Sequence, residues 1–143
     1  MLFRSTGIRH SEFNGSDSDA LHLLQIWLLP EQQNLAPGYE EKQLELKSDS
    51  LNLLASPDAR EGSVRIHQQS DLFRGLVGAG KSVSHALAAN RAAYIHVISG
   101  SVMVDGMELN AADGFGVHPQ AGNHSLEFTA SNEADFLLFD MAV

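Results

Sequence analysis

Cysteine is absent from the 143 residues of this chain. A chain without thiols can form no disulfide, no iron–sulfur cluster, no thiolate metal site and no cysteine nucleophile. Any bound metal would therefore have to be held by histidine, aspartate or glutamate side chains. Seven histidines are present, so histidine combined with carboxylates is the metal-binding chemistry that the composition leaves open.

Basic residues are scarce. Nine Lys and Arg residues accompany 18 Asp and Glu residues, which gives a formal net charge of −9. No Lys or Arg occurs after Arg91, although seven acidic residues lie beyond it. A chain with this balance would repel phosphate backbones and anionic lipid surfaces. We therefore expect neither nucleic acid nor a membrane as a partner.

Long hydrophobic runs are also missing. The longest, Leu21–Leu29, is interrupted by His22 and Gln25 and is too short to span a bilayer. The first residues, Met-Leu-Phe-Arg-Ser, lack the basic and then apolar pattern of a signal peptide. These features predict a soluble, cytoplasmic protein.

Glycine and proline, by contrast, divide the chain into short pieces that suit strands and leave little room for long helices. The predicted strands are Leu21–Leu29, Ser50–Ala55, Ser63–Gln68, Leu72–Val77, Tyr94–Ile98, Ser101–Val104, Phe115–Val117, Ser125–Thr129 and Phe136–Met141. Asp105-Gly106 predicts a hairpin, because both residues tolerate the positive φ angles of a type I′ turn. Many short strands without crossover helices predict an all-β barrel or sandwich.

A boundary is expected near Pro30–Tyr39, where proline and glycine interrupt the chain. It would separate a short leading piece, residues 1–30, from a fuller unit formed by residues 31–143.

The first candidate metal site is His10-Ser11-Glu12. In an extended strand, residues two apart point to the same face, so the imidazole of His10 and the carboxylate of Glu12 could bind one metal ion. Two ligands alone make a weak site. The alternative is that His10 and Glu12 form an exposed pair at the end of a strand.

Two later segments resemble degraded forms of the two conserved motifs of the cupins, and they make His85 and His124 a second candidate pair. These segments run from Gly80 to His85 and from Leu109 to His124. In the first, Leu87 stands where the second histidine of a His-x-His would fall, and Ala93 stands in place of the glutamate. In the second, the spacing differs by one residue. The resemblance therefore favours a metal-free structural barrel over a residual site at His85 and His124.

Several segments together resemble one family, the pirins, and in particular the bacterial pirin-like quercetinases. The segments are Gly7–Asn14, Leu24–Pro30, Leu35–Lys42, Leu53–Asp58, Gly62–Gln68 and Leu137–Asp140. They extend over nearly the whole chain. Pirins are bicupins, so the resemblance implies a jelly-roll cupin fold in which residues 1–30 correspond to the last strands of an N-terminal cupin and residues 31–143 to the C-terminal cupin.

The resemblance also implies a site. In the family, the N-terminal barrel holds one divalent metal, with iron as the first expectation, on three histidines and one glutamate. His10 and Glu12 match the third histidine and the glutamate, and Glu12 is also implied as a base. The other two histidines come from an earlier His-x-His that this chain does not contain. Metal binding is therefore expected only if another chain supplies those histidines.

Two functions follow from this resemblance. The first is a metal-dependent quercetin 2,3-dioxygenase acting on a flavonol, with its metal site completed by another chain. The second is a non-catalytic cupin module that acts through oligomerisation or protein binding. Because Leu21–Leu29 is apolar on both faces, we also expect the chain to recruit a second copy of itself and form a dimer.

Overall fold

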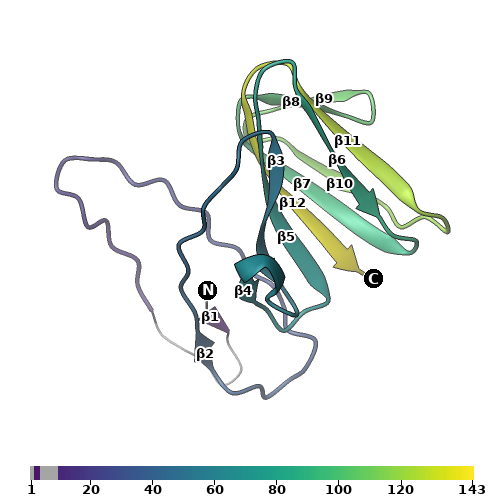
Figure 1. The fold of residues 1–143 in the computed structure, drawn as a ribbon. Helices are drawn as coiled ribbons and strands as arrows, with labels where there is room; N and C mark the ends of the chain where they lie inside the picture. The colour runs from purple at the N-terminus through teal and green to yellow at the C-terminus, as the bar shows by residue number, and fades with distance from the viewer. Residues whose placement is uncertain (1, 4–9) are drawn as a thin grey trace.

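The computed structural model describes residues 2–3 and 10–143, which form two stacked β-sheets and a small separate pairing of two short strands (Figure 1). The elements are β1 (Leu2–Phe3), β2 (Gly38–Tyr39), β3 (Ser50–Ser56), η1 (Arg60–Gly62), β4 (Val64–Arg65), β5 (Ser70–Val77), β6 (Ser82–Leu87), β7 (Arg91–Ser99), β8 (Ser101–Val104), β9 (Met107–Asn110), β10 (Gly114–Val117), β11 (His124–Ala130) and β12 (Ala134–Ala142). The larger sheet has the order β10-β7-β12-β5-β3-β4, and the smaller has the order β6-β11-β8-β9. The all-β prediction is confirmed.

Most predicted strands from Ser50 onward are confirmed, each with nearly the predicted bounds. They are β3, β5, β7, β8, β10, β11 and β12. The prediction for Ser63–Gln68 is correct only for Val64–Arg65, which pair with β3 in parallel. Strand β6 was not predicted. In the part of the chain that the structure describes, the only helical segment is the three-residue turn η1, and no helix there could cross a membrane.

The predicted hairpin is confirmed. Strands β8 and β9 pair in antiparallel fashion, with Val104 opposite Met107. Asp105 and Gly106 between them have φ angles of 49° and 78°. A type I′ turn needs positive φ at both of these positions, and Gly106 adopts it at no steric cost.

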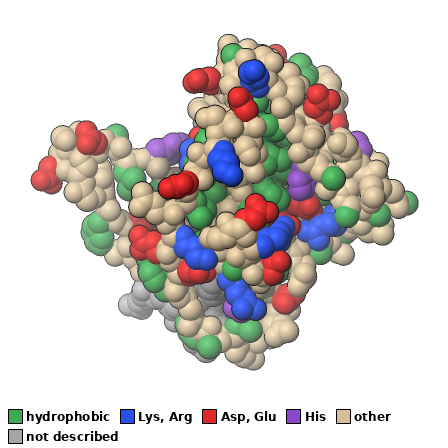
Figure 2. Space-filling model, viewed as in Figure 1, with side chains coloured by type: hydrophobic (Ala, Val, Ile, Leu, Met, Phe, Trp, Pro, Cys, Tyr) green, Lys and Arg blue, Asp and Glu red, His purple; other side chains and the backbone are tan. Residues whose placement is uncertain are grey.

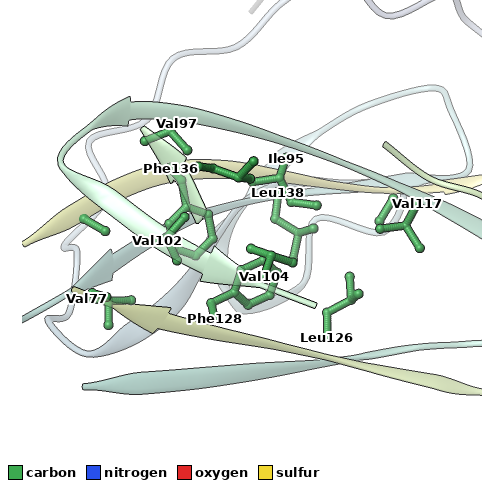
Figure 3. Packing of buried hydrophobic residues seen from close by; sticks show 14 of the residues in the cluster. Val77, Ile95, Val97, Val102, Val104, Val117, Leu126, Phe128, Phe136 and Leu138 are labelled. Atoms are coloured by element: carbon green, nitrogen blue, oxygen red, sulfur yellow. The ribbon is translucent and has the colours of Figure 1, made fainter. Parts of the chain in front are cut away.

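The main hydrophobic core lies between the two sheets (Figure 3). Its side chains alternate along the strands, as Ile95 and Val97 do on β7, because successive residues of a strand point to opposite faces. Phe128 of β11 and Phe136 of β12 stack across the gap with ring centroids 4.8 Å apart. The aromatic pair thereby joins the smaller sheet to the larger one.

A second cluster covers the outer face of the larger sheet. It contains Leu72 of β5 and Phe139 of β12, and Ile26 and Leu28 pack against it. Strand β12 is therefore buried on both faces, with Leu138 in the inner core and Phe139 in the outer cluster. This explains why four consecutive apolar residues, 136–139, occur in one strand.

Residues 10–37, called the N-terminal arm below, loop out beside the barrel and contain no strand or helix (Figure 1). The predicted strand at Leu21–Leu29 is therefore wrong. Alternating burial is present, since Ile26 and Leu28 pack inward while Trp27 and Leu29 are 67% and 81% exposed. However, a strand also needs a neighbour that accepts its backbone hydrogen bonds, and no described strand pairs with the arm.

The arm is attached to the barrel near its end. The backbone N–H of Glu31 donates to the carbonyl oxygen of His67, and the Gln68 amide donates to the carbonyl oxygen of Leu29, both over 2.8 Å. The division into residues 1–30 and 31–143 stays a prediction, which limited proteolysis can test.

Candidate metal site

His10 and Glu12 lie together at the start of the N-terminal arm. His10 Nε2 is 4.0 Å from Glu12 Oε1, and the two side chains are 22% and 61% exposed. They belong to an irregular segment rather than to the strand that the spacing predicted. The structure thus places the two groups together as an exposed pair, and their role as metal ligands stays a prediction.

A third polar group, the side-chain amide of Gln25, lies at the same imidazole. Gln25 Nε2 is 3.5 Å from His10 Nε2, so the middle of the arm folds back onto its start. The spacing of the sequence does not indicate that Gln25 lies beside His10. The signal that could have identified it was its position as a polar interruption of the apolar run Leu21–Leu29.

His85, on β6, faces a different set of groups. Its Nε2 is 2.8 Å from Oδ2 of Asp140 on β12, and its ring packs against Phe73 with centroids 5.0 Å apart. Arg91 binds the other carboxylate oxygen of Asp140 through its Nε. Burial alone would raise the pKa of Asp140, but the hydrogen bonds from His85 and Arg91 outweigh burial and hold that pKa below its ordinary value.

His124, at the start of β11, has another acidic partner. Its Nε2 is 3.3 Å from Oδ2 of Asp105 in the β8–β9 turn. His85 and His124 therefore bind separate carboxylates instead of converging on a shared position. Across residues 2–3 and 10–143, no group of three or more His, Asp or Glu side chains is placed to hold a metal ion.

The donor chemistry at His10 fits a divalent first-row metal, since imidazole nitrogen and carboxylate or amide oxygen are ligands that such metals accept. His10 and Glu12 could supply two ligands, whereas catalytic metal sites commonly have three protein ligands and one open position. The arm can therefore contribute to a metal site, and further ligands are needed to complete it.

Comparison with known proteins identifies the family. The family model for the quercetinase C-terminal cupin domain matches residues 53–141. Quercetin 2,3-dioxygenase of Escherichia coli K12 is 35% identical over 141 residues, which are 99% of this chain and 59% of that protein. This chain thus spans less than two thirds of the length of that relative.

Solved structures agree with this result. The crystal structure of YhhW from Escherichia coli has a TM-score of 0.76 and 30% identity, and the match covers 82% of this chain and 49% of that one. The structure of bacterial pirin YhhW from Escherichia coli in complex with nickel(II) has a TM-score of 0.72 and 29% identity, and the match covers 79% of this chain and 47% of that one. This chain accordingly belongs to the pirin family of cupins, and residues 53–141 are a C-terminal cupin domain of the quercetinase type.

Proposed function

We propose that this chain is part of a pirin-type quercetin 2,3-dioxygenase and contributes His10 and Glu12 to its divalent-metal site. The observation that carries the proposal is the 4.0 Å approach of His10 Nε2 and Glu12 Oε1 in a chain 35% identical to a quercetin 2,3-dioxygenase. The remaining ligands would have to come from residues outside this sequence. Iron is the first expectation for the metal, and the nickel(II) complex of a related pirin supports binding of a divalent first-row ion.

The residues present fit specific roles in flavonol oxidation. When bound, the metal would hold the hydroxyl and ketone oxygens of the flavonol and supply the redox chemistry with dioxygen. His10 would hold the metal through its ring nitrogen. The carboxylate of Glu12, 61% exposed, is accessible to a substrate and could accept the proton of the flavonol hydroxyl.

Metal content per chain tests this function. The wild-type chain, His10→Ala and the control His22→Ala, which changes another exposed histidine of the arm, are loaded with iron(II) or nickel(II), desalted and analysed by mass spectrometry. We expect near-stoichiometric metal in the wild type and in His22→Ala, and loss of metal in His10→Ala. Flavonol turnover would then be measured on the same three proteins.

A second function, a non-catalytic cupin module that acts by oligomerisation, is favoured by the exposed apolar side chains of the arm. Phe13, Trp27 and Leu29 are 85%, 67% and 81% exposed. An apolar patch of such side chains at a surface would suit a contact with another protein. If neither the wild type nor His10→Ala retains metal, the dioxygenase proposal is wrong and this second function takes its place.

A further inference from the structure

Residues 14–19 form a loop of the N-terminal arm, and Asn14 begins it with the one Asn-Gly pair of the sequence. The side chain of Asn14 closes the loop, because its Nδ2 donates to the carbonyl oxygen of Asp19 over 2.6 Å. We propose that Asn14 is a site of spontaneous deamidation, in which the backbone nitrogen of Gly15 attacks the side-chain amide and the resulting carboxylate opens the loop. This modification is independent of the proposed function.

Gly15 supplies the freedom that the attack needs. A Cβ atom added at Gly15 would meet no heavy atom within 4 Å beyond its chain neighbours, so nothing else crowds this part of the backbone. A residue without a side chain also lets the backbone turn into conformations that other residues rarely adopt. The five-membered ring that joins the backbone nitrogen of Gly15 to the side chain of Asn14 can therefore form at little steric cost.

The reaction balances with water as its only co-reactant. The backbone nitrogen of Gly15 forms a bond to Cγ of Asn14 and loses its proton. The bond from Cγ to Nδ2 then breaks, and ammonia leaves with that proton. Water opens the cyclic imide at either carbonyl group, which gives aspartate or isoaspartate. The chain thereby gains one negative charge and about 1 Da in mass.

A second contact of the same amide favours the attack. The backbone N–H of Ser16 donates to Oδ1 of Asn14 over 3.1 Å. Negative charge develops on this oxygen as the nitrogen attacks Cγ, and a donor already in place stabilises such a charge. The contact with Asp19 must break when the side chain turns toward Gly15. Because Asn14 and Asp19 are exposed, water can replace that hydrogen bond at low cost.

The product cannot keep the contact that closes the loop. The amide of Asn14 faces an acceptor on one side and a donor on the other, and a carboxylate can only accept. After deamidation, a carboxylate oxygen would face the carbonyl oxygen of Asp19, and neither group could donate. The acidic side chains of Asp17 and Asp19 would add like-charge repulsion. Deamidation therefore releases Asp19 from Asn14 and opens the loop.

Mass spectrometry of peptides from the aged full chain tests the modification. Asn123 and Asn132 are also exposed, and neither is followed by glycine, so they are controls within the same sample. We expect the peptide that contains Asn14 to gain about 1 Da and an isoaspartate signal before either control peptide does. Gly15→Ala, which the open space around Gly15 accommodates, should slow this gain about tenfold.

Amide hydrogen exchange tests the opening of the loop. The N–H groups of Ser18 and Asp19 both donate to Oγ of Ser16, over 3.3 Å and 3.0 Å. Asn14→Asp, which reproduces one product, should lose protection at these two amides. Asn132→Asp, which adds the same charge to another exposed segment, should keep it. Equal ageing of Asn14 and the control asparagines would overturn the modification, and unchanged exchange in Asn14→Asp would overturn the opening.

Discussion

At the scale of single residues, Asp140 is the buried charge at which the two sheets meet. It lies on β12 of the larger sheet and binds His85 from the smaller sheet and Arg91 from β7. Arg91 also donates to the carbonyl oxygen of Asp140 over 2.9 Å. A buried carboxylate is costly unless it is paired, so this network stabilises one relative arrangement of the sheets.

Replacement of Asp140 should therefore destabilise the fold. We expect Asp140→Asn to lower the free energy of unfolding by about 3–5 kcal/mol, because it leaves the half-buried Arg91 without its counter-charge. Asp105→Asn is the control, since Asp105 pairs with the partly exposed His124 and should cost about 1 kcal/mol or less. Urea unfolding measures both. A loss below about 1 kcal/mol in Asp140→Asn would contradict the structural role of this carboxylate.

The same carboxylate predicts a pH dependence. Because the pKa of Asp140 is lower in the folded state than its ordinary value of 3.8, the unfolded chain binds more protons at acid pH. The stabilisation is therefore complete well above pH 3.8 and is lost as the pH falls through the lower pKa of the folded protein. Asp71 lies opposite Asp140, on β5, and is the second carboxylate at this end of the barrel. It forms an ion pair with Arg60 at 2.5 Å.

Unfolding free energies measured between pH 7 and pH 3 check this sign. The wild type should lose stability toward pH 3, and Asp140→Asn should lose less over the same range. Equal losses of unfolding free energy in the two proteins would show that groups other than Asp140 cause the acid sensitivity.

The sequence indicated only the local part of the candidate site. His10 and Glu12 are two residues apart, so their proximity follows from the chain itself. Gln25 lies 15 residues from His10, and Asp140 lies 55 residues from His85. Contacts of that separation depend on how the arm folds back and how the sheets stack, and spacing does not encode either one.

At the scale of elements, the sequence predicts correctly those features that depend only on neighbouring residues. The β8–β9 hairpin was correct because Asp105 and Gly106 themselves adopt the required φ angles. The sequence does not predict strand β6, because His85 takes an inward-facing position and Ala86 an outward-facing one, which breaks the alternation of polar and apolar residues. The strand predicted at Leu21–Leu29 was wrong because periodicity indicates which faces are apolar and says nothing about a hydrogen-bonding neighbour.

The β5–β12 pair yields a prediction at this scale. Gly75 is opposite Phe136, and a Cβ atom at Gly75 would lie 2.3 Å from the ring carbon Cζ of Phe136. Phe136 is fully buried, so its ring has nowhere to move without disturbing the core. We expect Gly75→Ala to destabilise the protein by about 1–3 kcal/mol, measured by urea or thermal unfolding.

Gly122→Ala is the matched control, because a Cβ atom there meets nothing within 4 Å. It should change the free energy of unfolding by no more than about 0.5 kcal/mol. In addition, Phe136→Leu should cost less in the Gly75→Ala background than in the wild type, since the smaller side chain relieves the overlap. Additive costs would show that the ring is not the obstacle.

At the scale of the whole molecule, the N-terminal arm distinguishes this chain from a closed barrel. Figure 2 shows hydrophobic side chains on its surface and acidic side chains near its tip. Ile26 and Leu28 hold it against the outer cluster, while the alternate side chains Trp27 and Leu29 point away. The arm therefore packs apolar side chains against the outer cluster on one side and exposes apolar side chains on the other.

This surface is the physical basis for the predicted dimer, which stays a prediction. Size-exclusion chromatography with light scattering should give twice the chain mass of 15.5 kDa at micromolar concentration. The double variant Trp27→Ser, Leu29→Ser should shift the protein toward the monomer, because it removes two exposed apolar groups. Met107→Ser, at a position 48% exposed on β9, is the control and should remain dimeric. A wild type that is only monomeric would exclude self-association through the arm.

The double-sided burial of β12 has a consequence for the unfolded chain. The run Phe136-Leu137-Leu138-Phe139 has high β propensity and no charge, so once exposed it is a segment that favours aggregation. Asp135 and Asp140 flank it directly and repel other copies of the same segment. These two carboxylates thus act as gatekeepers during refolding, in addition to pairing with Arg74 and Arg91 in the native state. Refolding at a pH low enough to neutralise both should therefore yield more aggregate than refolding at neutral pH.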